Sequence, residues 1–73
     1  MEFSFSDNVN WRNNINDISF VYTGYTYAAT DWFTISEGRI LSTTSYAVGE
    51  HVFTIKATGY DDVVITVNVI PAD

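Results

Sequence analysis

The sequence predicts a mainly β fold, a small antiparallel β-sandwich formed by a single domain. Valine, isoleucine and threonine together make up about a third of the chain, a bias that is typical of pleated strands. Apolar and polar residues alternate along most of the sequence, which is the pattern of strands with one buried face. Aromatic residues make up 16% of the chain, and large rings suit the thin core between two sheets.

Short apolar runs separated by turn residues predict about seven strands. Phe3 and Phe5 indicate the first strand. The clearest later strands are predicted at residues 18–22, 31–36, 39–43, 51–57 and 63–70. Turns are expected at residues 23–24, 37–38 and 58–61, each of which contains a glycine, and Pro71 ends the last strand.

Residues 7–15 favour a short helix instead of a strand. The segment opens with an N-cap candidate at Asp7, and Trp11 and Ile15 follow four residues apart. Ile18 continues the same helical face three residues later. We therefore expect one or two helical turns at the end of an Ig-like sandwich, with residues 1–73 forming one module cut from a larger protein.

Charge and composition exclude several classes of function. The net charge of −6 would repel phosphate backbones and anionic membrane surfaces, so nucleic-acid binding is not expected. No apolar run approaches 18 residues, so membrane insertion is not expected either. The chain has no cysteine, and therefore neither a disulfide nor a thiolate site.

No pattern of catalytic or metal-ligating residues is recognisable. His51, the single histidine, is predicted at the start of a strand, on the same face as Phe53 and Ile55. No motif brings an acid or a nucleophile to it, and Asp61–Asp62 reads as turn chemistry. We expect no enzyme activity, no catalytic residue, no metal site and no cofactor.

The most suggestive stretch for binding is the aromatic segment of residues 22–32. It contributes four candidate ligand-binding residues, Tyr22, Tyr25, Tyr27 and Trp32. Tyrosine and tryptophan give large contact areas at low entropic cost, and they also stack on sugar rings. The alternative is that some of these rings fill the core, and the sequence leaves both interpretations open.

Three segments together resemble a known family, namely residues 11–15, 49–57 and 58–63. They read Trp-Arg-Asn-Asn-Ile, Gly-Glu-His-Val-Phe-Thr-Ile-Lys-Ala and Thr-Gly-Tyr-Asp-Asp-Val, and their order is similar to that of the haemoglobin-interacting domain family. The resemblance implies an Ig-like module of a secreted or wall-attached Gram-positive protein. It also implies haemoglobin as the protein partner.

The residues that carry the resemblance have structural roles by our interpretation. Trp11 would plug the end of the core, Gly59 would turn the chain and Tyr60 would cap the core. Ile15, Phe53 and Ile55 would supply core side chains. Two further hypotheses therefore stay open beside protein binding: a spacer or accessory domain of a larger extracellular enzyme, and a carbohydrate-binding module.

Overall fold

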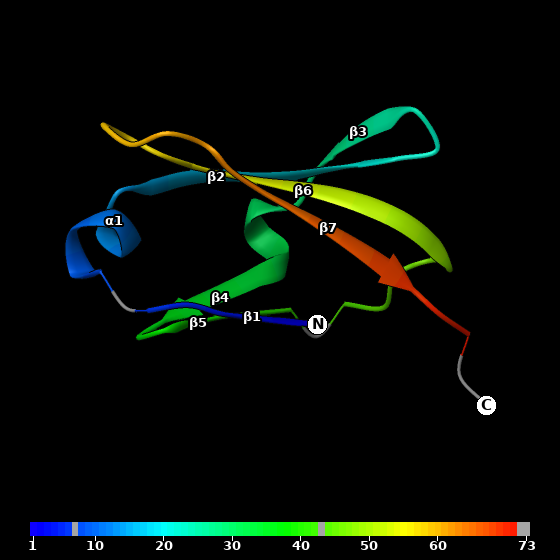
Figure 1. Ribbon diagram of the computed structural model, residues 1–73, viewed down its shortest axis with the longest axis horizontal. Coiled ribbons are helices and arrows are strands. Elements are labelled where there is room, and N and C mark those ends of the chain that lie inside the picture. Colours follow the sequence, from blue (N-terminus) through cyan, green and yellow to red (C-terminus); the bar gives the residue numbers. More distant parts are fainter. Residues whose placement is uncertain (7, 43, 72–73) are drawn as a thin grey trace.

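The computed structural model describes residues 1–6, 8–42 and 44–71, and folds them into two antiparallel sheets (Figure 1). The three-stranded sheet has the order β1 (Glu2–Ser4), β5 (Arg39–Ser42), β4 (Phe33–Ser36). The four-stranded sheet has the order β3 (Tyr25–Ala28), β2 (Ile15–Tyr22), β6 (Gly49–Ala57), β7 (Val63–Val69). Helix α1 (Val9–Asn13) and the 3₁₀ turn η1 (Thr30–Trp32) complete the fold. The predicted sandwich with one short helix is confirmed.

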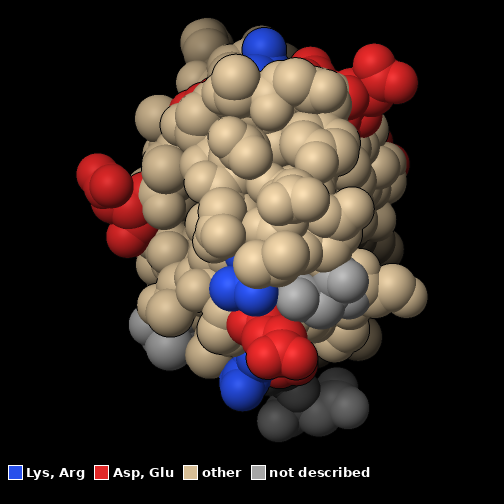
Figure 2. Space-filling view, turned by 90° about the vertical axis from the view of Figure 1, so that its left-hand side faces the viewer, with Lys and Arg blue, Asp and Glu red and all other residues tan. Residues whose placement is uncertain are grey.

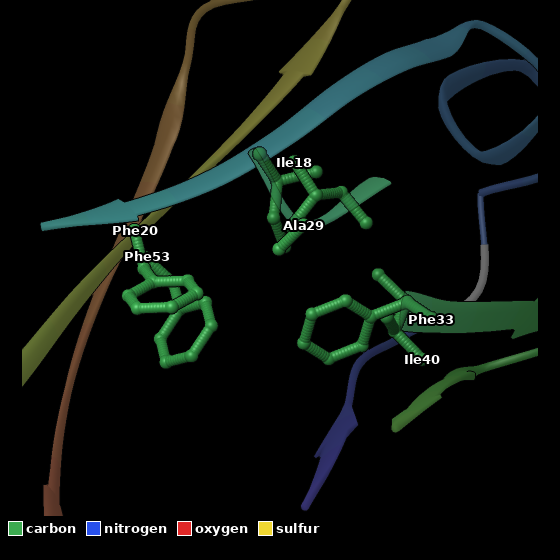
Figure 3. Close-up of a cluster of buried hydrophobic side chains, with 7 residues drawn as sticks. Ile18, Phe20, Ala29, Phe33, Ile40 and Phe53 are labelled. Atoms are coloured by element: carbon green, nitrogen blue, oxygen red, sulfur yellow. The ribbon is translucent and has the colours of Figure 1, made fainter. Parts of the chain in front are cut away.

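The core lies between the two sheets and is built around the inward row of β6. His51, Phe53, Ile55 and Ala57 are all buried, as the period-two alternation predicts. Figure 3 shows rings from both layers meeting there. The buried apolar cluster consists of Ile18, Phe20, Ala29, Phe33, Ile40, Phe53 and Ile55.

Helix α1 has the predicted length of one to two turns, but Ile15 and Ile18 are not on it. Asn8 caps α1, its Oδ1 accepting from two backbone N–H groups, and the helix ends at Asn13. Ile15 already belongs to β2, where it pairs with Ala57. The register then shifts by a β-bulge between Ile15 and Asp17. The extra residue reverses which positions of β2 face the core. Ile15 and Ile18 therefore both face inward although they are three residues apart, and this is also the spacing of residues on one face of a helix. Asp7, the predicted cap, lies outside the described residues.

Asp31 and Trp32 belong to η1, and not to the predicted strand, which begins at Phe33. The chain crosses from one sheet to the other at this point, since β3 and β4 lie in different sheets. Two hydrogen bonds hold the crossing to β2: the Ala29 N–H donates to the Ile18 carbonyl at 2.8 Å, and the Ile18 N–H donates to the Thr30 hydroxyl at 2.9 Å. The backbone groups that a longer strand would pair are thereby satisfied locally.

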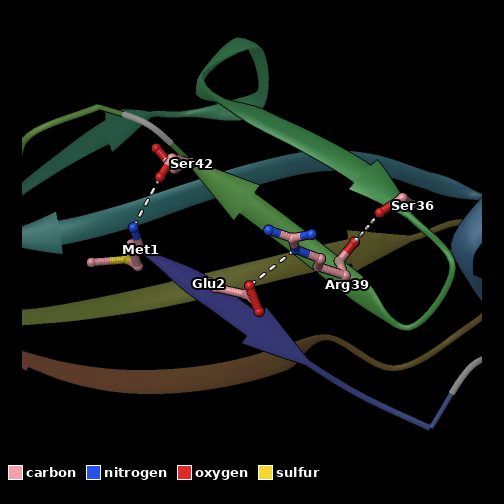
Figure 4. Close-up of polar contacts among 5 residues, drawn as sticks. All are labelled: Met1, Glu2, Ser36, Arg39 and Ser42. Carbon is pink, nitrogen blue, oxygen red and sulfur yellow. Dashed lines mark hydrogen bonds and ion pairs between the residues drawn. The ribbon is translucent and has the colours of Figure 1, made fainter.

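The other strand ends agree with the predictions to within two residues. β1 ends at Ser4, although the Phe5 N–H still donates to the Gly38 carbonyl. Figure 4 shows how β1 is held, with the Glu2 carboxylate 3.0 Å from Arg39 Nε and the Met1 amino group bonded to the Ser42 carbonyl. The ion pair is about half exposed, so it adds little to stability.

The β2–β3 hairpin turns through two residues with positive φ. Thr23 has φ 51° and Gly24 has φ 83°, and Tyr22 pairs directly with Tyr25 across the turn. Two positive φ values in a two-residue loop match the backbone twist of the flanking strands. Glycine adopts this region freely, whereas a β-branched residue is strained in it. Thr23 is therefore a local source of strain.

Replacing Thr23 by asparagine is expected to stabilise the domain. Asparagine tolerates the left-handed region better than threonine, so Thr23→Asn should gain about 1 kcal/mol. For a domain of this size that gain raises Tm by roughly 4–8 °C in a calorimetric scan. The control Thr26→Asn, on exposed β3, should not raise Tm, because asparagine is a poor strand former. Equal stabilisation by both changes would contradict strain at Thr23.

Truncation of Phe53 is expected to remove most of the stability of the domain. The ring is fully buried, and Phe→Ala at such sites costs about 3–5 kcal/mol. That loss approaches the whole stability of a small domain. Urea denaturation followed by circular dichroism measures it. The control Val64→Ala, on the exposed side of β7, should change the free energy of unfolding by less than about 0.5 kcal/mol.

Candidate functional site

An open hollow with aromatic walls lies beside the end of β2, where β3, η1 and the start of β6 meet it. We call it the aromatic hollow. Its volume is about 280 Å³. Its lining consists of Phe20, Tyr22, Tyr27, Trp32, Ser45, Tyr46, Ala47 and His51. None of the described lining residues carries an Asp, Glu, Lys or Arg side chain, and ring faces and ring edges make up most of the surface.

The rings form a cup whose floor is the buried ring of Phe20. Tyr27 stacks on this floor with centroids 5.1 Å apart, and Tyr46 meets it edge-on at 5.7 Å. Trp32 lies 5.6 Å from the floor and is tilted by 50°. Offset and edge-to-face pairs of this kind each stabilise the arrangement by about 0.5–1.5 kcal/mol beyond their buried area. The cup is therefore held in shape before any ligand arrives.

His51 is buried against one wall of the aromatic hollow. Its ring stacks on Tyr22 with centroids 4.4 Å apart and an interplanar angle of 15°. Its Nδ1 lies 3.0 Å from the Gly49 carbonyl oxygen, and this contact restricts rotation of the ring. Tyr22 is held in turn, since its hydroxyl donates to the Val48 carbonyl at 2.7 Å. One face of the imidazole is thus covered by protein.

Three of the four sequence-predicted ligand residues line the aromatic hollow. Tyr27 and Trp32 are both 40% exposed, and Tyr22 forms a half-buried part of the wall. Tyr25 is 69% exposed and lies outside the lining, on the hairpin tip. Tyr27 and Trp32 thus pack against Phe20 on one side and are partly exposed on the other, and their role in binding stays a prediction.

Tyr46 and His51 are the lining residues that sequence reasoning missed as site residues. Tyr46 comes from an irregular segment before β6, and its hydroxyl donates to Ser42 Oγ at 2.9 Å. Its ring contacts with Phe20 and Trp32, which are distant in the sequence, have no local sequence signal. The period-two pattern did place His51 on the inward face of β6, where its ring reaches both Phe20 and Tyr46.

A second hollow, the helix-end hollow, lies at the opposite end of β2. Its volume is about 290 Å³, and it is lined by Phe5, Ser6, Asn8, Trp11, Tyr60 and Val63. Trp11 packs edge-on against Phe5 at 5.1 Å and against the core, whereas Tyr60 is 42% exposed and Gly59 forms the adjoining turn with φ 84°. Figure 2 looks onto this end of the molecule, and uncharged residues occupy the middle of the face with charged ones toward its margins.

The remaining predicted structural residues pack in or against the core. Phe53 and Ile55 belong to the buried cluster, and Ile15 is half-buried beside it. Within residues 1–6, 8–42 and 44–71, no group of three or more His, Cys, Asp or Glu side chains is placed to hold a metal ion. In the same ranges, no helix has the length and apolar character needed to cross a bilayer.

These features define a small β-sandwich whose most distinctive surface is a preformed aromatic cup. Residues 1–70 match the family model described as "Heme-binding protein Shr-like, Hb-interacting domain", and the chain belongs to this family. The resemblance drawn from the three sequence segments is confirmed. Neither a curated protein nor a solved structure matches the chain.

The wall of the aromatic hollow depends on a close approach between Gly49 and Tyr22. Gly49 has φ 128°, and a Cβ on it would lie 3.2 Å from Tyr22 Cε1. Gly59 also has a positive φ, but a Cβ on it would meet no other atom, so Gly59→Ala should cost only the backbone strain of about 1–2 kcal/mol. Gly49→Ala is expected to destabilise the domain by more, because its Cβ would also displace Tyr22. Chemical denaturation gives both values, and near-UV circular dichroism reports the displaced Tyr22 ring. Equal losses of unfolding free energy in the two variants would show that the Tyr22 ring moves aside without an energetic penalty.

Proposed function

We propose that this domain is a non-catalytic module that binds haemoglobin through the rings around the aromatic hollow. The observation that carries the proposal is the convergence of Tyr22, Tyr27 and Trp32 with Tyr46 in one open cup. Two of these rings keep 40% of their surface exposed, so they are accessible to a partner. Exposed aromatic residues around a desolvated centre are the usual hot spots of protein interfaces.

The chemistry of the lining supports recognition over catalysis. Among the described lining residues the titratable side chains are tyrosines and His51, with the Ser45 hydroxyl beside them and no carboxylate. A catalytic nucleophile needs a base within hydrogen-bond reach, and the described hydrogen bond of the His51 ring goes to the Gly49 carbonyl. A wall of rings offers contact area and shape instead. The family description, a haemoglobin-interacting domain, gives the partner its identity.

The partner surface that we propose is protein, because the aromatic hollow does not fit a haem group. Its volume of about 280 Å³ is just below the range of roughly 300–1,000 Å³ for small-molecule sites. Haem carries two carboxylates, which basic side chains bind in other proteins. The lining has no Lys or Arg, and Arg39 is paired with Glu2 on the three-stranded sheet. We therefore assign no haem ligand to this chain.

The setting that we propose is extracellular, as one module of a larger surface or secreted protein of a Gram-positive bacterium. The family resemblance supports this setting. An alternative role, that of a spacer beside other domains, is favoured by the family-diagnostic residues near Gly59, which shape a turn and a hollow at the other end of the sandwich.

Calorimetric titration against methaemoglobin tests the proposal. The domain is expected to give saturable heat at protein concentrations on the order of tens of micromolar. Trp32→Leu should weaken binding about tenfold or more, because loss of an aromatic hot spot costs about 1–2 kcal/mol or above. Tyr60→Leu is the matched control, since Tyr60 is 42% exposed at the opposite end of the sandwich.

Two outcomes would contradict this assignment. Absence of heat for a folded wild-type domain would remove haemoglobin as the partner and leave the spacer role. Loss of binding in Tyr60→Leu with full binding in Trp32→Leu would move the interface to the helix-end hollow. Tyr27→Leu provides a second test of the cup if Trp32→Leu does not give a wild-type circular dichroism spectrum.

A further inference from the structure

The aromatic hollow is built from parts of the chain that contain no Lys or Arg. Its lining comes from residues 20–32 and 45–51, and the sequence has no Lys or Arg between Arg12 and Arg39 or between Arg39 and Lys56. Both stretches do contain acidic residues, Asp31 and Glu50. The net charge of the whole chain is −6. The cup therefore sits in a negative field.

Asp31 and Glu50, which adjoin lining residues in the sequence, have exposed positions and no ion-pair partner among the described residues. Asp31 directly precedes Trp32 in η1, and Glu50 directly precedes His51 in β6. Lys56, on the far half of β6, lies 3.9 Å from Asp62.

The rings are oriented so that their faces and edges surround one small space. Trp32 and Tyr46 lie 6.0 Å apart at an angle of 54°, and Tyr46 meets His51 at 5.8 Å and 84°. The stacked pairs Phe20–Tyr27 and Tyr22–His51 form the floor and one wall, and the inclined rings of Trp32 and Tyr46 complete the sides of a cage. The faces of aromatic rings carry negative partial charge, so a cage of them attracts a cation.

We propose that the aromatic hollow receives one cationic side chain, an arginine, projected from the surface of the protein partner. The volume of about 280 Å³ suits a single side chain. A guanidinium group is planar and weakly hydrated, so it stacks on Tyr and Trp rings more readily than a lysine ammonium group does. The inference rests on the proposed function, because it names the chemistry by which the same cup holds its partner.

A pair of matched probes tests this inference without haemoglobin. Nα-acetyl-arginine methylamide and its citrulline analogue have nearly the same shape, but the citrulline urea group is neutral. We expect the arginine probe to shift the NMR signals of the Trp32 indole saturably at concentrations on the order of millimolar. The citrulline probe should bind at least about two- to fivefold more weakly, which is the contribution of an exposed cation–π contact.

Variants locate the response. Trp32→Leu should abolish the preference for arginine over citrulline, and Tyr60→Leu, an equally exposed ring outside the cup, should retain it. Tyr27→Leu serves in the same way if Trp32→Leu is not folded. Equal affinity for the two probes would overturn the inference. Arginine-induced shifts confined to amides near the acidic side chains, with the ring signals unmoved, would overturn it as well.

The haemoglobin titration separates this inference from the proposed function. A domain that binds haemoglobin through Trp32 but does not distinguish arginine from citrulline keeps its proposed function and loses the cationic site. A domain that prefers arginine but gives no heat with haemoglobin keeps the cationic site and loses its proposed partner.

Discussion

The packing of Phe53 between the two sheets is the contact on which the rest of the structure depends. Its ring lies 5.3 Å from Phe3 and 5.9 Å from Phe33 on the three-stranded sheet, and 5.2 Å from Phe20 on the four-stranded sheet. A chain of 73 residues without cysteine has no covalent cross-link between its layers. The layers are held by burial of apolar area, and large rings bury the most area per residue.

The same cluster of rings extends from the core to the surface, so stability and recognition share residues. Phe20 contacts Phe53 on its inner side and forms the floor of the aromatic hollow on its outer side. A substitution at Phe20 would therefore change both the free energy of unfolding and the shape of the cup. Tyr27 and Trp32 lie on the outer layer of this cluster, so substitutions there test the proposed binding with less effect on folding than substitutions at Phe20.

Sequence patterns predicted the parts of the fold that depend on local periodicity, and failed where distant contacts decide. The inward row of β6 and the hairpin at residues 37–38 follow from alternation and glycine placement. The bulge between Ile15 and Asp17 reverses that alternation, so the period suggested a helix where β2 begins. For the candidate site, alternating tyrosines identified the region, but Tyr46 joins it through ring contacts with Phe20 and Trp32, which are distant in the sequence and which no local pattern encodes.

Two of the three segments that carry the family resemblance, residues 11–15 and 58–63, lie at the opposite end of the sandwich from the candidate binding residues, whereas the third, residues 49–57, contributes His51 to the aromatic hollow. Trp11 and the Gly59–Tyr60 turn surround the helix-end hollow, whereas Tyr27 and Trp32 surround the aromatic hollow, in a molecule 38 Å long (Figure 1). Residues that shape a turn and plug one end of a core are constrained by packing, so sharing them shows a common scaffold. Rings that are 40% exposed have fewer packing constraints, and their identity is free to follow the partner. The chemistry of the cup, aromatic walls in an acidic surrounding, is therefore the better guide to what this particular chain binds.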